Sequence, residues 1–275
     1  MWDVGFDQIT RFIATIYQEN LNALPSLFDL HVHTNQGSPD SALTPEEMVS
    51  EVKRLGLTGA MVTEHDGWQK AEFQAFASKQ DIVLVRAHEV YTPLGHVITM
   101  GLEGHVAGYG DSLETIRVLR KAVDNAGGFM ILAHPFRFLF DLPHYTQNML
   151  FQEADNIPES ADEASKHPIF EIVDEIEVVN GGNIEVENRY AQEVAAVLGK
   201  WGTGGSDAHS TDGFARGTTA FNGDIRNERD LLDALRAGDF APVEGFHIGK
   251  PANYGRAAWL KPEMLNGHSH ESFSS

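Results

Sequence analysis

The chain has 275 residues, of which 42% are hydrophobic and 22% charged, as in soluble globular proteins, and its formal net charge is −20 at pH 7. Such an acidic chain is not expected to bind nucleic acid stably, although a local basic pocket for a phosphorylated small molecule is compatible with this charge. The absence of cysteine excludes disulfides, thiolate metal sites and thiol nucleophiles, and the sequence lacks both a leader pattern and an apolar run of the ~20 residues that span a membrane, so a cytoplasmic protein without membrane association is expected.

The first predicted element is an amphipathic helix over 6–21, whose apolar side chains recur at helical spacing. We assign residues 1–26 to a helical extension that covers the core, and an interface between copies of the chain is left open. A short buried strand over 27–30 follows. A helix is predicted over 45–55, because Thr44 is a good N-cap, a proline occupies the first helical position and Gly56 ends the apolar pattern.

The rest of the chain alternates strands with helices. Further strands are predicted over 58–63, 81–87, 129–133, 175–179, 201–205 and 218–221, and a short extended piece over 95–101 is a candidate for a hairpin. Helices are predicted over 68–78, 112–125, 185–198 and 228–236. Residues 137–170 form an irregular excursion over one end of the core, and the end of the chain forms a disordered tail. This alternation predicts an α/β fold with a mainly parallel sheet, open or closed into a barrel.

Polar side chains, mostly histidines with acidic neighbours, follow almost every predicted strand. They are His31 and His33, Glu64-His65-Asp66, His88-Glu89, His134, Asn180, and Asp207 with His209. Since ligands gather at the carboxyl ends of parallel strands, these side chains are expected to meet in one pocket. The spacing of His31 and His33 would place two ring nitrogens on the same side of a strand. The pattern therefore predicts a polynuclear metal centre built from nitrogen and oxygen ligands.

Such a set of ligand-capable side chains suits more than one metal ion. A carboxylate such as Glu89 can bridge two metal ions, while each ion collects histidine nitrogens and keeps open positions for water. Two ions about 3.5 to 4 Å apart form a clamp for displacement at phosphorus, in which one activates water and the other takes up the charge of an oxygen.

The ordered set of motifs resembles the polymerase-and-histidinol-phosphatase (PHP) family over residues 27 to 240. The motifs are His31-x-His33, Asp40, Thr-Glu-His65-Asp, Glu89, His96, Ala-His134-Pro and Gly-Ser-Asp207-Ala-His209. The resemblance implies a distorted (β/α)7 TIM-like barrel over 27–262, preceded by the N-terminal helix and followed by a tail over 263–275. It also implies two or three divalent ions (Mn²⁺, Fe²⁺ or Zn²⁺). The implied ligands are His31, His33, Asp40, His65, Glu89, His96, His134, Asp207 and His209.

The sequence departs from the family pattern at two places. A longer gap than usual precedes Asp40, which makes it the least secure of the nine ligands. The chain between Glu89 and His134 is also too short for the inserted domain that many nuclease-like relatives carry there. The second departure favours a small, open site and a small-molecule substrate.

Other polar residues have both functional and structural interpretations. Asp66 is a candidate proton carrier or the N-cap of the helix that follows it, and His88 should pack in the core because its side chain points away from the face of Glu89. Arg137 and Arg216 are candidates for gripping a phosphate or carboxylate, or for structural salt bridges. Asn180 is assigned to substrate or ligand orientation, or to a turn.

The function predicted from these residues is hydrolysis of a small phosphorylated substrate by a metal-dependent phosphoesterase, with a metal-bound hydroxide as nucleophile. His134 or His209 would help to protonate the leaving oxygen if metal does not engage it fully. Two alternatives stay open. The same site could hydrolyse a carboxylic or carbamate ester, or the chain could be a non-catalytic, metal-stabilised module that binds partners through its N-terminal helix.

Overall fold

Ten strands form one continuous sheet in the computed structural model of the protein, which describes residues 24–104, 106, 113–140, 148–151, 157–253, 260 and 264–265. The strands are β1 (Ser26–Val32), β2 (Gly59–Glu64), β3 (Val83–Thr92), β4 (Gly95–Met100), β5 (Phe129–Leu132), β6 (Glu175–Asn180), β7 (Thr203–Gly205), β8 (Gly217–Phe221), β9 (Phe240–Glu244) and β10 (Ala252–Asn253). Their order in the sheet is β10-β9-β8-β1-β2-β3-β4-β5-β6-β7.

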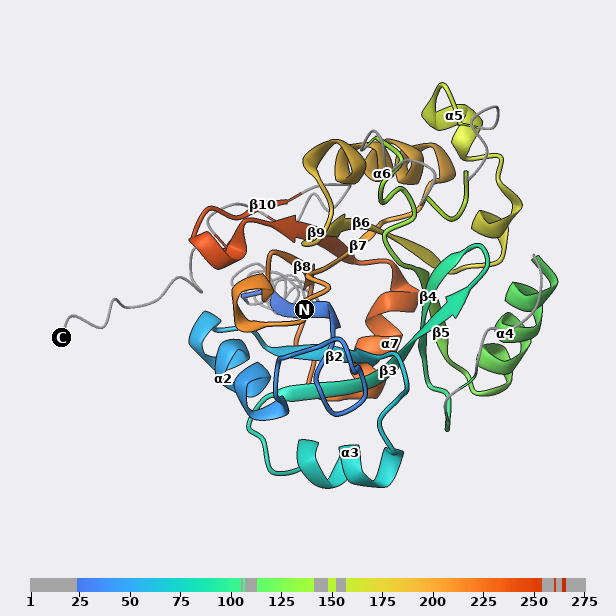
Figure 1. Ribbon diagram of the computed structural model, residues 1–275. Helices are drawn as coiled ribbons and strands as arrows, with labels where there is room; N and C mark the ends of the chain where they lie inside the picture. The colour runs from blue at the N-terminus through green and yellow to red at the C-terminus, as the bar shows by residue number, and fades with distance from the viewer. Residues whose placement is uncertain are drawn as a thin grey trace, which may run out of the picture.

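The helices lie around the outside of this sheet (Figure 1). They are α2 (Pro45–Leu55), α3 (Lys70–Ala77), α4 (Leu113–Asn125), α5 (Ala161–Ala164), α6 (Glu185–Leu198) and α7 (Glu228–Ala237), with short 3-10 turns η3 (Pro168–Glu171), η4 (Thr211–Gly213) and η5 (Phe246–Ile248). The bounds of α2 and α6 agree with the predicted helices. The predicted helix over 6–21 lies outside the described residues, as does the predicted tail over 263–275 except for residues 264–265, of which Leu265 is buried. None of the described helices is both long and apolar enough to cross a membrane.

The sheet is nearly closed into a barrel. The segment after β7 returns to β1, where Val32 and Ala208 form a parallel bridge and the amide of Asp207 donates to the carbonyl of His31 at 2.7 Å. The predicted distorted barrel is thus confirmed, whereas the count of seven β/α units is not, because β3 and β4 follow one another without a helix between them.

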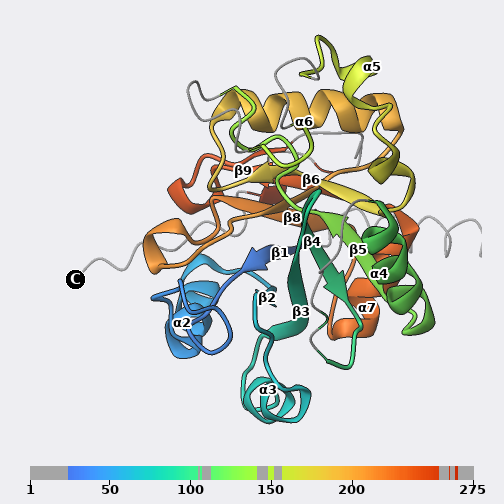
Figure 2. The same cartoon turned by 45° about the vertical axis from the view of Figure 1, so that its right-hand side comes forward.

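The sheet is mixed rather than mainly parallel. Strands β1, β2 and β3 are parallel to one another, as are β5, β6 and β7, but β4 runs antiparallel to both of its neighbours. Strand β8 also runs antiparallel to β1 and to β9 (Figure 2). Because β4 is reversed, its first residues lie beside the last residues of β3, and His96 comes to the same end of the barrel as the carboxyl ends of its parallel neighbours.

An apolar core fills the barrel below the predicted site. On β3, Val85, Ala87 and Glu89 share one face because side chains alternate along a strand. Val85 and Ala87 belong to a buried cluster that also contains Leu231 and Leu235 of α7. The carboxylate of Glu89 therefore stands at the upper edge of a packed apolar floor, where burial fixes its position.

Candidate metal centre

His31 and His33 lie at the end of β1 with no exposed surface. Their Nε2 atoms are 3.0 Å apart, and the Nε2 of His33 lies 3.2 Å from an oxygen of Asp207. The approach of β7 to His31 requires glycine at position 205, since a Cβ there would lie 2.3 Å from the Cβ of His31. The backbone thus brings two imidazoles and a carboxylate around one point.

Glu89 lies at the centre of the cluster, and its side chain is almost fully buried. One carboxylate oxygen lies 3.3 Å from His31 Nε2, 2.9 Å from His96 Nδ1 and 3.0 Å from His134 Nε2. The other oxygen lies 3.2 Å from His33 Nε2 and 3.3 Å from His65 Nδ1. This arrangement gives Glu89 the geometry of a residue that two neighbouring cation positions could share.

The loops after β5 and β7 supply the remaining side chains. His134 follows β5 with φ of 29° and Asp207 follows β7 with φ of 55°, both in the left-handed region that non-glycine residues rarely adopt. Such backbone conformations persist where surrounding contacts hold them, and they occur often at functional sites. The carbonyl of Asp207 accepts the Nδ1–H of His209 at 2.9 Å, and the Nε2 of His209 faces the carboxylate of Asp40.

Three groups of side chains bring their ligand-capable atoms close enough together to surround an ion. They are His33 with His65 and His209; His31 with His33, Glu89 and Asp207; and Glu89 with His96 and His134. Asp40 is exposed, and its carboxylate lies 3.5 Å from His65 Nε2 and 3.4 Å from His209 Nε2. The structure thus gathers all nine residues that the sequence singled out, with Asp40 at the outer edge.

The donor chemistry fits divalent cations that accept nitrogen and oxygen ligands. The Nδ1 of His31 is bonded to Glu177 at 3.1 Å and the Nδ1 of His33 to Ser38 at 3.1 Å, so each ring directs the lone pair of its Nε2 into the cluster. Two such lone pairs 3.0 Å apart, beside two carboxylates, repel one another unless a proton or a cation lies between them. Imidazole with carboxylate is a ligand set suited to manganese, iron or zinc.

The carboxylates set the protonation of the buried imidazoles. Burial alone would lower the pKa of His33, but hydrogen bonds to Asp207 and Glu89 raise it to about 9. Burial, and then the nearby Arg137, lower the pKa of His134 to about 4. Burial would raise the pKa of Glu89, yet His31 and the hydrogen bond from His134 hold it well below its ordinary range. The cluster thus favours ionised carboxylates and a neutral His134.

Two buried carboxylates support the histidines; Glu64 was among the residues expected at the pocket, whereas Glu177 was not predicted. Glu177 on β6 accepts the ring N–H of His31 and, at 2.9 Å, the backbone N–H of His134. Glu64 at the end of β2 accepts the hydroxyl of Ser38 at 2.6 Å, and Ser38 in turn contacts the ring of His33. Glu177 carried a signal in the sequence, because it interrupts an apolar strand with a charge.

Arg137 lies beside the cluster and forms an ion pair there, which was the structural alternative for this residue. Its Nη2 donates to Asp207 at 2.6 Å and to the amide oxygen of Asn180 at 2.7 Å, and its Nε donates to Asn183 at 3.0 Å. Asn180 is buried, and its amide also donates to Glu177 at 2.8 Å. Asn180 therefore holds Arg137 and Glu177 in place, and a contact with substrate would require these bonds to break.

The other candidates lie further from the cluster. Arg216 is exposed and lies against Gly181, and no bond joins it to the nine residues within the described part of the chain. Asp66 is exposed, and it is not the N-cap of α3, because Gln69 occupies that position. His88 is buried with its Nε2 2.7 Å from Arg86 Nη1, which confirms the predicted packing role.

Known proteins share parts of this sequence and its fold. Over 74 residues the chain is 35% identical to the error-prone DNA polymerases of Mycobacterium tuberculosis and Mycobacterium bovis, a match that spans 26% of this chain and only 7% of those relatives. The crystal structure of PsfC from Pseudomonas syringae is similar with a TM-score of 0.53 and 17% identity, over 90% of this chain and 97% of that one. An amidohydrolase from Chromobacterium violaceum matches with a TM-score of 0.46 and 18% identity, over 76% of this chain and 96% of that one.

Family models cover most of the described barrel. The model of the PHP domain matches residues 29–173, and the model of a PHP-associated region matches residues 185–240. The first match spans the segment from the end of β1 through His134 and includes seven of the nine clustered residues: His31, His33, Asp40, His65, Glu89, His96 and His134. The chain belongs to the PHP domain family.

Proposed function

We propose that this protein is a metal-dependent phosphoesterase that hydrolyses a small phosphorylated substrate. The observation that carries the proposal is the convergence of three ligand groups that share His33 and Glu89. Membership of the PHP family supports a metal-dependent hydrolase. The proposed ligand sets are the three groups described above, with Asp40 joining His65 and His209, and they suit two or three ions of manganese, iron or zinc.

Ions held in this way would activate water and neutralise charge on the phosphoryl oxygens. The chain's own residues supply orientation. Glu177 and Ser38 fix the rings of His31 and His33, so that the same nitrogen of each ring faces the centre. His134, which is buried and has a lowered pKa, acts as a neutral donor of a lone pair, whereas the partly exposed His209 is better placed to exchange a proton with solvent.

Arg137 supports phosphate as the reacting group. Its guanidinium forms an ion pair with Asp207 of the cluster, in a chain whose net charge is −20. Two of its nitrogens are fixed by Asp207, Asn180 and Asn183, and within the described residues no bond uses Nη1. A planar guanidinium fixed along one edge is suited to bind oxyanions through the other.

The proposal is tested with protein loaded with Mn²⁺ and three chromogenic esters: p-nitrophenyl phosphate, its bis-ester and p-nitrophenyl acetate. We expect hydrolysis of a phosphate ester, and a fall to below about a hundredth of the wild-type rate in Glu89→Ala, because this residue belongs to two ligand groups. Glu103→Ala removes an exposed carboxylate paired with Lys70 and should leave the rate unchanged.

The three substrates separate the alternatives. Hydrolysis of the acetate alone would replace the phosphoesterase with a carboxylic ester hydrolase. No turnover of any ester, with metal bound in full, would favour the non-catalytic module. Wild-type activity in Glu89→Ala would contradict the assignment of that residue.

A further inference from the structure

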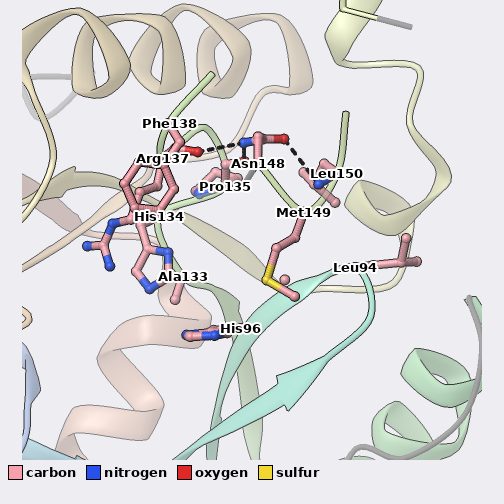
Figure 3. Close-up of a pocket in the computed structure, with 11 residues that line it drawn as sticks. Leu94, His96, Ala133, His134, Pro135, Arg137, Phe138, Asn148, Met149 and Leu150 are labelled. Atoms are coloured by element: carbon pink, nitrogen blue, oxygen red, sulfur yellow. Dashed lines mark hydrogen bonds between the residues drawn. The ribbon is translucent and has the colours of Figure 1, made fainter. Parts of the chain in front are cut away.

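A pocket opens directly beside the group formed by Glu89, His96 and His134. His96, His134 and Arg137 line it at one end, and Leu94, Met149 and Leu150 line the other, with about 520 Å³ of space counted out to the surrounding solvent. Figure 3 shows His134 and His96 on two sides of this space, with the Met149 side chain extending between them and Leu94. The pocket is therefore continuous with the proposed metal centre and opens to the solvent.

The wall around Met149 is held by Asn148. The side-chain nitrogen of Asn148 donates to the carbonyls of Pro135 and Arg137, and its oxygen accepts the amides of Leu150 and Phe151. Asn148 is 2% exposed, so its amide joins two segments of the wall and is not directed at a ligand (Figure 3). This leaves no polar side chain at the apolar end of the pocket among its described lining residues.

The apolar end is also anchored in the core. Leu150 and Phe151 belong to the buried cluster that contains Phe136 and Leu139, and Leu94 packs against the same cluster. Hydrophobic side chains that are packed in this way keep their positions when a ligand enters the pocket. The pocket thus combines a polar end beside the proposed ions with a preformed apolar end.

We propose that this pocket binds the organic group of the phosphate ester, and that this group is an uncharged hydrocarbon or aromatic group. The inference rests on the proposed function, which places the phosphoryl group at the cluster beside Arg137. The part of the substrate next to it then faces Leu94 and Met149. A hydroxylated or charged group would lose its hydration there without gaining a hydrogen bond from these side chains.

The test uses protein loaded with Mn²⁺ and a series of alkyl monophosphates, from ethyl through propyl and butyl to hexyl. These esters have similar leaving groups and differ in apolar length. We expect kcat/KM to rise by about fourfold for each methylene that enters the pocket, mainly through KM. Glycerol 1-phosphate has the carbon skeleton of propyl phosphate with two added hydroxyls, and it should be the poorer substrate of the pair by at least about tenfold.

Two variants connect this preference to the pocket. Met149→Gln and Leu94→Gln keep most of the side-chain volume but add a polar group, so both should flatten the dependence of kcat/KM on chain length. Val118→Gln, an exposed apolar position on α4, is the matched control and should leave the series unchanged.

The possible results separate the two proposals. Phosphate release without dependence on chain length, or equal slopes in the wild type and both pocket variants, would overturn the pocket assignment and leave the phosphoesterase standing. If no alkyl ester releases phosphate but the nitrophenyl bis-ester is hydrolysed, the pocket assignment is overturned and the phosphoesterase stands. The absence of hydrolysis of every phosphate ester, the nitrophenyl esters included, would overturn both.

Discussion

Glu177 forms hydrogen bonds with three groups that support the proposed metal centre. Its carboxylate contacts the Nδ1 of His31, the backbone N–H of His134 and the side-chain amide of Asn180. In Glu177→Gln one oxygen is replaced by a donor that cannot accept the ring N–H of His31. Since partners of this kind typically contribute 10- to 100-fold to metal affinity, we expect a weakening of about that size. Titration of the metal-free protein with Mn²⁺ or Zn²⁺ against a chelating fluorophore measures it.

Glu175→Gln is the matched control for this measurement. Glu175 lies two residues earlier on the same strand and is similarly buried, but its carboxylate accepts the amides of Trp201 and Gly202, away from the histidines. Metal affinity should be unchanged in this variant. Equal affinities in Glu177→Gln and the wild type would show that Glu177 does not orient His31.

The sequence predicted the residues around the centre better than it predicted their supports. A ligand at the end of a strand is visible as a polar residue after an apolar run, as at Glu89 and His134. The partner of an imidazole depends instead on which strands meet across the barrel. Glu177 on β6 reaches His31 on β1, although these strands are not neighbours in the sheet, and no local pattern encodes that contact.

The contact between the start of β6 and the segment before β7 should make the free energy of unfolding depend on pH. Glu175 at the start of β6 accepts the two amides that precede β7, and burial raises its pKa above the ordinary value of 4.5 despite these hydrogen bonds. The folded state therefore binds this proton more tightly than the unfolded state does. Its contribution to the free energy of unfolding is complete below about pH 4.5 and is lost as the pH rises through the raised pKa.

Urea unfolding of the metal-free wild type and of Glu175→Gln, from about pH 4 to about pH 8, checks this prediction. The wild type should lose stability relative to the variant as the pH rises, because the glutamine does not ionise. A difference that stays constant over this range, or that changes in the opposite direction, would contradict the raised pKa.

Helix ends were predicted more accurately than strand directions. The cap at Thr44 and the left-handed Gly56 bound α2 as expected, since both act through local backbone geometry. Strand direction depends on distant pairing. The hairpin of β3 and β4 was among the predictions, but the antiparallel pairing of β4 with β5 and of β8 with β1 was not expected in a mainly parallel sheet. Strand β9 was missed because it contains Pro242, a residue that argues against a strand in sequence patterns.

The barrel as a whole concentrates charge in its upper end. Glu89 and Glu177 are buried and Asp207 is partly buried, and all three carboxylates contact His31 above an apolar floor. Burying several carboxylates together is costly unless positive charge accompanies them. In the metal-free protein protons and Arg137 supply that charge, and divalent ions would replace the protons.

The most direct measurement is anomalous X-ray diffraction from crystals of the full chain soaked in Mn²⁺ at neutral pH. The account predicts strong anomalous peaks within coordination distance of His31, His33, Glu89 and Asp207, and at one or both of the neighbouring groups that share His33 and Glu89. Fully ordered side chains around a centre that shows no anomalous density, with manganese bound elsewhere or not at all, would contradict the proposed metal centre and the hydrolase built on it.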